Sequence, residues 1–196
     1  MPKKKSVKKA AHRFYQQLDD IEAFLKSTRP TLSDDHLSWV HEYAVLRVYR
    51  EFEHLVLEAI VGAINNDTHT ISATTGIEFP KHLTDEVCEY LVVRDGYLDF
   101  RGRDGLISLI RRYVPAGHYL LEAVKHSRYK RTLEQLTALR NLAAHSSAVS
   151  KRRAKSTLGL EKIGSAGAWL KTQRRIDDIL IRMASFSREV GENAPY

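Results

Sequence analysis

The residues in this sequence that are best suited to chemistry lie close together, at Arg140, Asn141 and His145. An arginine guanidinium is always charged and binds phosphate oxygens in a bidentate manner. A histidine titrates near neutral pH, so it can accept or deliver a proton during a reaction. This combination suits chemistry at a phosphodiester, with the asparagine placed to orient the histidine or the backbone.

The spacing of these residues limits how one helix can present them. They end an amphipathic segment, in which Asn141 and His145 are four residues apart and share a helix face. Arg140 and His145 are five residues apart, which corresponds to a rotation of about 140° on an α-helix. We therefore expect either that the helix bends or ends near Ala144, or that two copies of the chain contribute to one site.

Basic residues flank this segment on both sides. Residues 101–131 contain eight lysines and arginines against two acidic residues, and residues 151–175 contain eight against one. Clustered cations bind nucleic acid because they release its condensed counterions. A solvated basic face without a ligand is the alternative interpretation. The cations that we predict to bind nucleic acid are Arg128, Lys130, Arg131, Lys151, Arg152, Arg153 and Lys155.

The segment Arg140-Asn-x-x-x-His145 resembles the signature of the HEPN superfamily (higher eukaryotes and prokaryotes nucleotide-binding), in which an arginine, often followed by asparagine, stands a few residues before a histidine. Residues 52–55, Phe-Glu-x-Leu, are similar to an early helix that carries an acidic residue in that family. Residues 97–100, Tyr-Leu-Asp-Phe, look like its prokaryotic toxin and phage-defence branches. The resemblance implies an all-α, up-down helical bundle and a metal-independent endoribonuclease without a cofactor.

The resemblance also implies a mechanism, in which the 2′-hydroxyl of RNA attacks the adjacent phosphorus and leaves a cyclic phosphate and a 5′-hydroxyl. His145 would transfer the proton, and Arg140 would stabilise the developing charge. Asn141 would orient His145 or the backbone, and Glu53 would hold Arg140 by a charge-assisted hydrogen bond. A symmetric homodimer would join two motifs in one cleft, within a toxin–antitoxin or antiviral defence system that includes an antitoxin or defence partner.

Two simpler interpretations stay open at this point. In the first, Arg140 only bonds a carboxylate such as Glu53, while His145 caps carbonyls at the end of its helix. In the second interpretation the domain is a non-catalytic helical module that binds RNA or a partner protein.

A metal site is not predicted. Glu51-x-x-His54 has the spacing found in di-iron bundles, but those sites need a second such pair and two further glutamates, and we find no second pair. His36 and His41, like His118 and His126, lack the spacing of metal ligands. The stretch Arg101-Gly-Arg-Asp-Gly is not a phosphate-binding loop of the Walker type.

The pattern of apolar residues predicts an all-α chain with one domain over residues 10–190, a basic flexible tail at 1–9 and a flexible tail at 191–196. Residues 67–80 and the region from 146 to 164 are expected to be loop-like, and residues 92–98 form either a small hairpin or a loop. Asp104 is expected to cap one helix. The helices are expected at residues 8–26, 34–65, 84–91, 105–114, 119–126, 131–147 and 165–189.

The composition excludes several classes of protein. The chain has 196 residues, 43% hydrophobic and 28% charged, with a formal net charge of +7; this excludes a disordered or collagen-like chain. The single cysteine, Cys88, excludes an intramolecular disulfide and favours a reduced, cytoplasmic protein. No apolar run approaches the length of a membrane span, and the lysine-rich start lacks the apolar region of a secretory signal.

Overall fold

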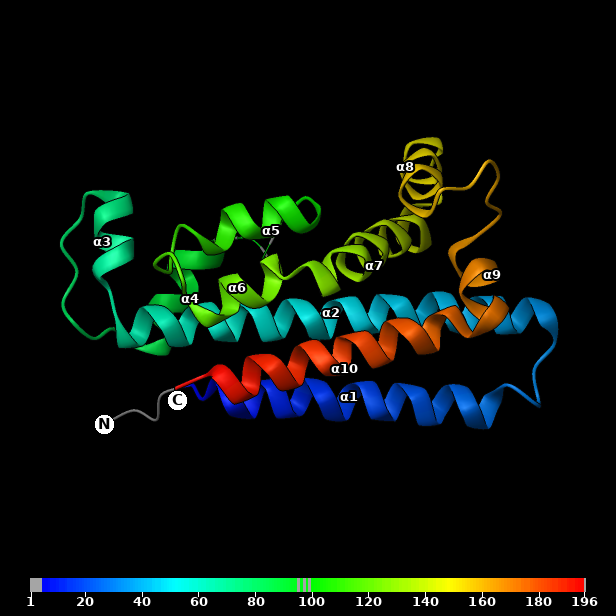
Figure 1. The fold of residues 1–196 in the computed structure, drawn as a ribbon, viewed down its shortest axis with the longest axis horizontal. Coiled ribbons are helices and arrows are strands. Elements are labelled where there is room, and N and C mark those ends of the chain that lie inside the picture. The colour runs from blue at the N-terminus through cyan, green and yellow to red at the C-terminus, as the bar shows by residue number, and fades with distance from the viewer. Residues whose placement is uncertain (1–4, 95, 97, 99, 196) are drawn as a thin grey trace.

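The computed structural model describes residues 5–94, 96, 98 and 100–195, and every regular element in these ranges is a helix (Figure 1). The prediction of an all-α helical bundle is therefore confirmed. The elements in chain order are α1 (Val7–Thr28), α2 (Asp34–Asn66), α3 (His69–Thr75), α4 (Asp85–Val93), α5 (Gly102–Ile110), α6 (Tyr119–Lys125), α7 (Ser127–His145), α8 (Ala148–Leu158), α9 (Ala166–Lys171), the 3-10 turn η1 (Thr172–Arg174) and α10 (Arg175–Asn193).

Several predicted boundaries are wrong. The short helices α3 and α8 lie in regions that we expected to be loops. The predicted last helix is interrupted, because Gln173 and Arg174 both adopt the left-handed conformation at φ 54° and separate α9 from α10. Helix α5 begins at Gly102 with no side-chain cap, so Asp104 lies in its first turn instead of capping it.

The two predicted tails also extend too far into the folded chain. Helix α1 starts at Val7, whose side chain is buried, because Ser6 caps its first turn by accepting a hydrogen bond from the Lys9 amide. At the other end, α10 continues to Asn193, and Ala194 is buried. The predicted hairpin or loop at 92–98 includes residues 95 and 97, which lie outside the described part of the chain.

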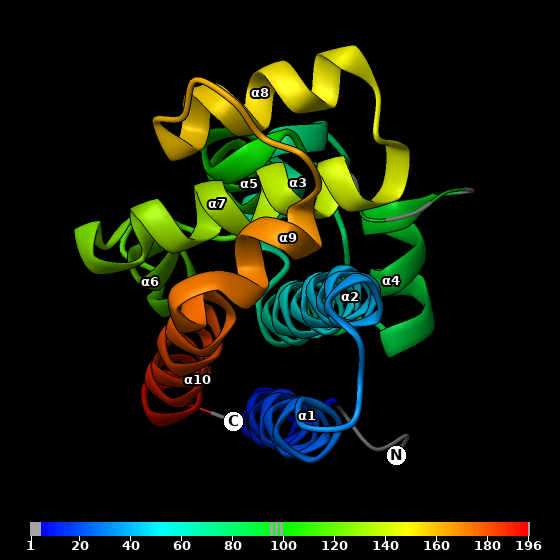
Figure 2. The ribbon, with the colours of Figure 1, turned by 90° about the vertical axis from the view of Figure 1, so that its right-hand side faces the viewer.

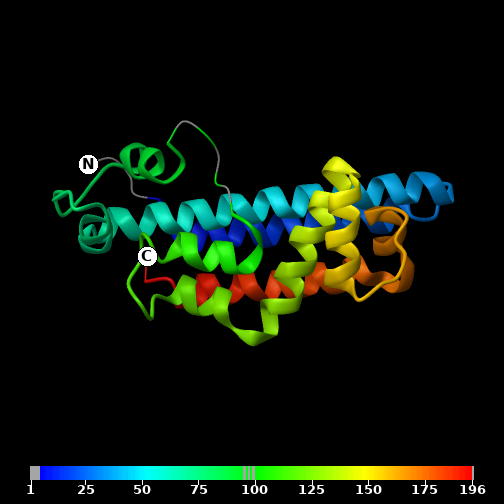
Figure 3. The same ribbon diagram turned by 90° about the horizontal axis from the view of Figure 1, so that it is seen from above.

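The three long helices α1, α2 and α10 lie side by side, and the other elements cover them from one side (Figures 1 and 2). Helix α2 has 33 residues, which corresponds to a length of about 50 Å. It runs antiparallel to α1, whereas α10 runs in the direction of α2 (Figure 1). Helix α7 crosses over α2, and α8 folds back across α7 (Figures 2 and 3).

An aromatic cluster holds the centre of this arrangement together. The ring of Phe52 on α2 contacts Phe14 of α1 at 6.4 Å, Phe186 of α10 at 5.7 Å and Phe100 at 6.3 Å between centroids. The buried ring of Tyr129, on α7, then packs edge-on against Phe186 at 5.2 Å. Edge-to-face pairs at these distances add to the free energy of burial. The cluster therefore joins the helix that carries the candidate motif to the three-helix layer.

Helix α9 lies against the first half of α2 at a glycine. The backbone amide of Gly167 lies 3.3 Å from a carboxylate oxygen of Glu42. A Cβ atom at this position would overlap the carbonyl oxygen of Ser38 and crowd the Glu42 side chain. Only a residue without a side chain lets the two helices approach this closely.

We expect Gly167→Ala to destabilise the protein by about 1–3 kcal/mol or more, because the clash with backbone atoms of α2 cannot be relieved by rotating a side chain. Thermal unfolding followed by circular dichroism measures this change. Gly164→Ala is the matched control, since a methyl group added at Gly164 meets no neighbouring side chain or backbone atom within 4 Å. Equal melting temperatures for the two variants would contradict the expected clash.

His41 lies buried beside this contact. Because this histidine is buried, we expect the stability of the folded protein to depend on pH. One ring nitrogen, Nδ1, lies 2.7 Å from the Leu37 carbonyl oxygen, and the other, Nε2, is buried without a partner among the described residues. Burial lowers the pKa of His41 below its ordinary value of 6.5, partly offset by the bond to Leu37. Arg29 and Lys171 lower this pKa further, and Asp177 raises it.

A lowered pKa in the folded state means that the unfolded chain binds the proton more tightly. His41 therefore contributes stability above pH 6.5, and this contribution is lost as the pH falls through the folded pKa. We expect the melting temperature of wild type to fall more between pH 7 and pH 5 than that of His41→Leu. Parallel pH curves for the two proteins would rule out this contribution.

Candidate active site

Helix α7 carries all three residues of the candidate motif, and it is uninterrupted from Ser127 to His145. It ends where Ser146 adopts the left-handed conformation at φ 45° and donates its amide to the Leu142 carbonyl. Arg140 is half-buried, and His145, the last helical residue, is exposed. The helix ends one residue after Ala144, and since it is uninterrupted through His145, the two side chains leave α7 in different directions within one chain.

Arg140 is held in place by packing and by its neighbour. Its guanidinium donates a hydrogen bond of 2.9 Å to the side-chain oxygen of Asn141. The guanidinium carbon lies 4.9 Å from the centre of the buried Tyr49 ring, an arrangement in which the ring face attracts the cation. The Tyr49 ring in turn packs on Phe100 at 5.9 Å. The oxygen of Asn141 is therefore used to position Arg140, a role that differs from the predicted orientation of His145.

Arg140 opens onto a cleft of about 520 Å³ between α2, α4 and α7. Glu53, the acidic residue that we predicted to accompany Arg140, lines the same cleft. Tertiary structure thus brings together two residues that are 87 positions apart in the chain, and it leaves His145 outside the cleft lining. The cleft is lined by Glu53, His54, Leu57, Glu89, Val93, Gly96, Leu98 and Arg140.

His54 is a residue of this cleft that the sequence did not single out as a proton carrier. Its Nδ1 atom lies 3.5 Å from a carboxylate oxygen of Glu51, which also pairs with Arg47 at 3.1 Å. The Glu51–His54 spacing therefore describes a local contact on one helix turn. The described residues contain no group of three or more histidine, cysteine, aspartate or glutamate side chains that could hold a metal ion. The useful sequence signal was that His54 lies next to Glu53.

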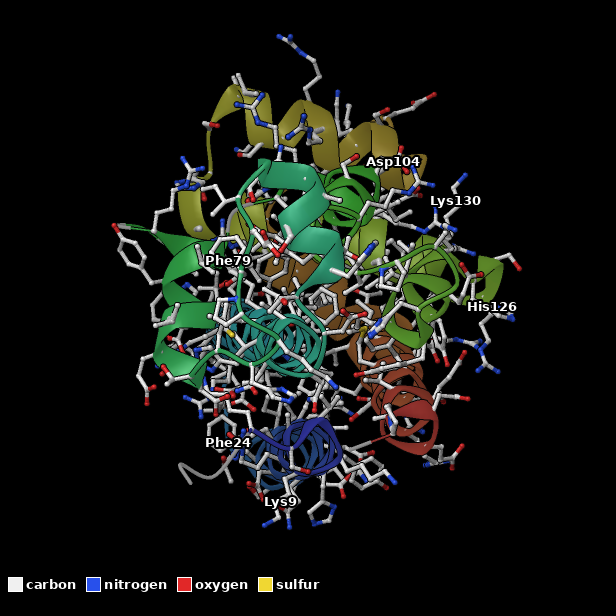
Figure 4. The ribbon with its side chains drawn as sticks, turned by 90° about the vertical axis from the view of Figure 1, so that its left-hand side faces the viewer. Lys9, Phe24, Phe79, Asp104, His126 and Lys130 are labelled. Carbon is white, nitrogen blue, oxygen red and sulfur yellow. The ribbon has the colours of Figure 1, made fainter. Side chains whose placement is uncertain are left out.

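The predicted nucleic-acid-binding cations fall into two separate groups. Arg128, Lys130 and Arg131 lie in the first turns of α7, and Lys130 projects at the outer edge of the molecule (Figure 4). Arg128 pairs with Glu189 of α10, which also accepts a 2.6 Å hydrogen bond from the Tyr129 hydroxyl. Arg131, the residue of this group nearest to His145 in the chain, is about 21 Å from it along the helix axis. Arg128 thus fastens α7 to α10.

The second group lies close to His145, because two residues separate α7 from α8. Ser147 caps α8 by accepting a hydrogen bond of 3.1 Å from the Ser150 amide. Lys151, Arg152 and Arg153 are exposed on α8, and Lys155 is half-buried. Within the described part of the chain, no carboxylate forms an ion pair with any of these four side chains. Their charge is therefore available to a ligand.

Comparison with known proteins identified no relative of this chain. The chain was compared with protein-family models, with curated proteins and with solved structures, and none of the three comparisons found a match. In the part of the chain that the structure describes, no helix is both long enough and apolar enough to cross a membrane.

Proposed function

We propose that this protein is a metal-independent endoribonuclease of the HEPN type whose active site is shared by two chains. The observation that carries the proposal is the arrangement on α7, where Arg140 is fixed in a cleft and His145 is exposed at the helix end. One chain holds the two groups apart, and a second copy related by two-fold symmetry would place the His145 of one chain near the Arg140 of the other.

In the proposed reaction each group has a defined task. The imidazole of His145 takes the proton of the 2′-hydroxyl, whose oxygen attacks the adjacent phosphorus, while the bond to the 5′-oxygen breaks and that oxygen takes a proton from water. The guanidinium of Arg140 binds the non-bridging oxygens, on which negative charge develops in the transition state. Asn141 and Tyr49 keep that guanidinium in one orientation. DNA lacks the 2′-hydroxyl and is not a substrate.

An exposed face of α2 supports the proposed homodimer. Trp39 and Tyr43 are 64% and 68% exposed, although large aromatic side chains are usually buried. Leu46, Arg50, Glu53 and Leu57 continue from them at alternating spacings of three and four residues, so these side chains share one face of the helix. That face leads into the Arg140 cleft, which Glu53 and Leu57 line. A second copy that covers it would bury the two aromatic rings beside the shared site.

The cations of α8 support RNA as the substrate. Lys151, Arg152 and Arg153 are exposed, and α8 follows His145 after two residues, so a phosphate backbone bound by α8 passes close to the motif. We further propose that the enzyme acts in a toxin–antitoxin or antiviral defence system, in which a partner protein restrains it.

The test is cleavage of a labelled single-stranded RNA by purified protein in the presence of EDTA. We expect wild type to yield products with a cyclic phosphate and a 5′-hydroxyl, and to leave DNA of the same sequence intact. His145→Ala and Arg140→Ala should each lower the rate by about 100-fold or more, because each removes a group that acts in the transition state. His54→Ala is the control variant, because His54 is the histidine that lines the Arg140 cleft. RNA degradation by His145→Ala at the wild-type rate would refute the proposal.

The second candidate function is RNA binding without cleavage, which the exposed cations of α8 favour. This function predicts affinity for RNA that survives His145→Ala and falls steeply as salt is raised. Replacing Lys151, Arg152 and Arg153 by alanine should then weaken binding and reduce the slope of the salt dependence, because three phosphate contacts are lost. Fluorescence anisotropy at several salt concentrations measures both quantities.

A further inference from the structure

A second hollow, of about 540 Å³, is lined by residues of α7, α9, η1 and α10. It is separate from the Arg140 cleft, because its α7 residues lie in the first half of that helix and the two linings share no residue. Its volume is in the range of small-molecule sites, about 300–1,000 Å³. The lining side chains that matter here are Arg131, Gln135, Trp169, Arg175, Asp178 and Arg182.

The arginines of this pocket differ in the contacts that they make within the protein. Arg175 is committed to the protein, since it donates to the Trp169 carbonyl at 3.1 Å and to the Gln173 side chain at 2.8 Å, and lies over the Trp169 ring. Arg131 and Arg182 are exposed, and no carboxylate of the described residues forms an ion pair with either. Two guanidinium groups without an ion-pair partner among the described residues, one from α7 and one from α10, favour a phosphate group, which accepts bidentate hydrogen bonds.

The second observation is the side chain of Gln135. This residue is 8% exposed, it lines the pocket, and its side chain makes no hydrogen bond to any residue that the structure describes. The amide of Gln135 is accessible from the pocket, so it can hydrogen-bond a ligand atom or water there. Asp178, also in the lining, is an acceptor that repels a phosphate but suits the hydroxyl groups of a sugar.

One of the two left-handed residues that interrupt the last helix, Gln173, lines the pocket. Gln173 and Arg174 both have φ 54°, which is uncommon for residues other than glycine. This geometry separates α9 from α10 and places Gln173 in the lining, where it accepts the hydrogen bond from Arg175. Backbone strain of this kind often accompanies ligand sites.

From these observations we propose that the pocket binds a hydroxylated phosphate monoester, of the sugar phosphate class. Arg131 and Arg182 bind the phosphate. The side-chain amide of Gln135 forms a hydrogen bond with the ester oxygen or with a hydroxyl group, and Asp178 accepts a hydrogen bond from a hydroxyl group. The proposal does not depend on RNA cleavage. The same chemical group occurs in a free sugar phosphate and at the 5′-phosphorylated end of an RNA.

The test is isothermal titration of the full-length protein with ribose 5-phosphate, ribose and inorganic phosphate. We expect ribose 5-phosphate to bind more tightly than either fragment. Arg131→Ala, Arg182→Ala and Gln135→Leu should each weaken it by about tenfold or more, as expected for a lost hydrogen bond to a charged group. Asp178→Asn should weaken the binding of ribose 5-phosphate and strengthen the binding of inorganic phosphate. Arg188→Ala is the matched control, an exposed arginine of α10 outside this pocket.

A second experiment distinguishes a free sugar phosphate from the 5′-phosphorylated end of an RNA as the source of the phosphate group. A short RNA with a 5′-phosphate is compared with the same RNA carrying a 5′-hydroxyl, in wild type and in Arg131→Ala. Binding of ribose 5-phosphate identifies a free sugar phosphate, and a preference for the 5′-phosphorylated RNA that Arg131→Ala abolishes identifies an RNA end. The proposal is overturned if neither ligand shows a phosphate preference, or if Arg188→Ala weakens binding as much as Arg131→Ala and Arg182→Ala do.

Discussion

Co-expression of Arg140→Ala chains with His145→Ala chains should restore RNA cleavage that neither variant has alone. In a two-fold dimer with shared sites, a mixed dimer contains one site with both substitutions and one site with neither. Random association makes half of the dimers mixed, each with one intact site out of two, so we expect about a quarter of the wild-type rate. Each variant by itself should show about 1% of that rate or less, because it lacks a group that acts in the transition state.

This experiment separates a shared site from a site within one chain. If Arg140 acts with the His145 of its own chain, mixing the two variants restores nothing. If it acts with His54 at the same cleft, His145→Ala alone keeps the wild-type rate. Trp39→Ala combined with Tyr43→Ala provides an independent control, since both side chains are exposed on the proposed dimer face. We expect that double variant to be monomeric in size-exclusion chromatography with light scattering, and inactive although folded. An active monomer would contradict the shared site.

Phe52→Ala should lower the free energy of unfolding by about 3–5 kcal/mol, which is the range for removing a buried phenylalanine from a packed core. Phe52 is 1% exposed and contacts the rings of Phe14, Phe100 and Phe186. For a chain of this size the loss corresponds to a melting temperature lower by about 6–20 °C. It is also a large share of a total stability of about 5–15 kcal/mol.

Phe24 offers a matched control for this substitution. It lies on α1, is 50% exposed and projects at the edge of the bundle (Figure 4). We expect Phe24→Ala to change the free energy of unfolding by about 0.5 kcal/mol or less, as is usual for surface positions. Chemical denaturation of both variants gives the comparison. A Phe52→Ala variant as stable as Phe24→Ala would show that the aromatic cluster does not hold the helices together.

The long helices were predictable because their apolar residues repeat with helical period. Residues 8–26 and 34–65 correspond to α1 and α2. The short helices α3 and α8 were missed. Helix α8 has 11 residues and two buried side chains, Ser150 and Ala154, so its sequence has almost no apolar stripe. Its position comes from packing against α7.

The candidate site, like the fold, was predictable from the sequence only in part. The residue types of Arg140, Asn141 and His145, and their spacing on one helix, are local properties that the sequence determined by itself. The convergence of Glu53, His54 and Arg140 on one cleft depends on how α7 crosses α2. No local pattern specifies that crossing, because it follows from the packing of Tyr49, Phe52, Tyr129 and Phe186.

The sequence by itself therefore determined the class of the fold, the two longest helices, the charge that brackets the motif and the chemistry available to Arg140 and His145. Tertiary structure decided which cations form ion pairs. Arg128 pairs with Glu189, whereas no carboxylate of the described residues pairs with the cations of α8. Tertiary structure also decided where ligands can enter. Periodicity and residue type act over a few residues, whereas clefts and ion pairs form between segments that only folding brings together.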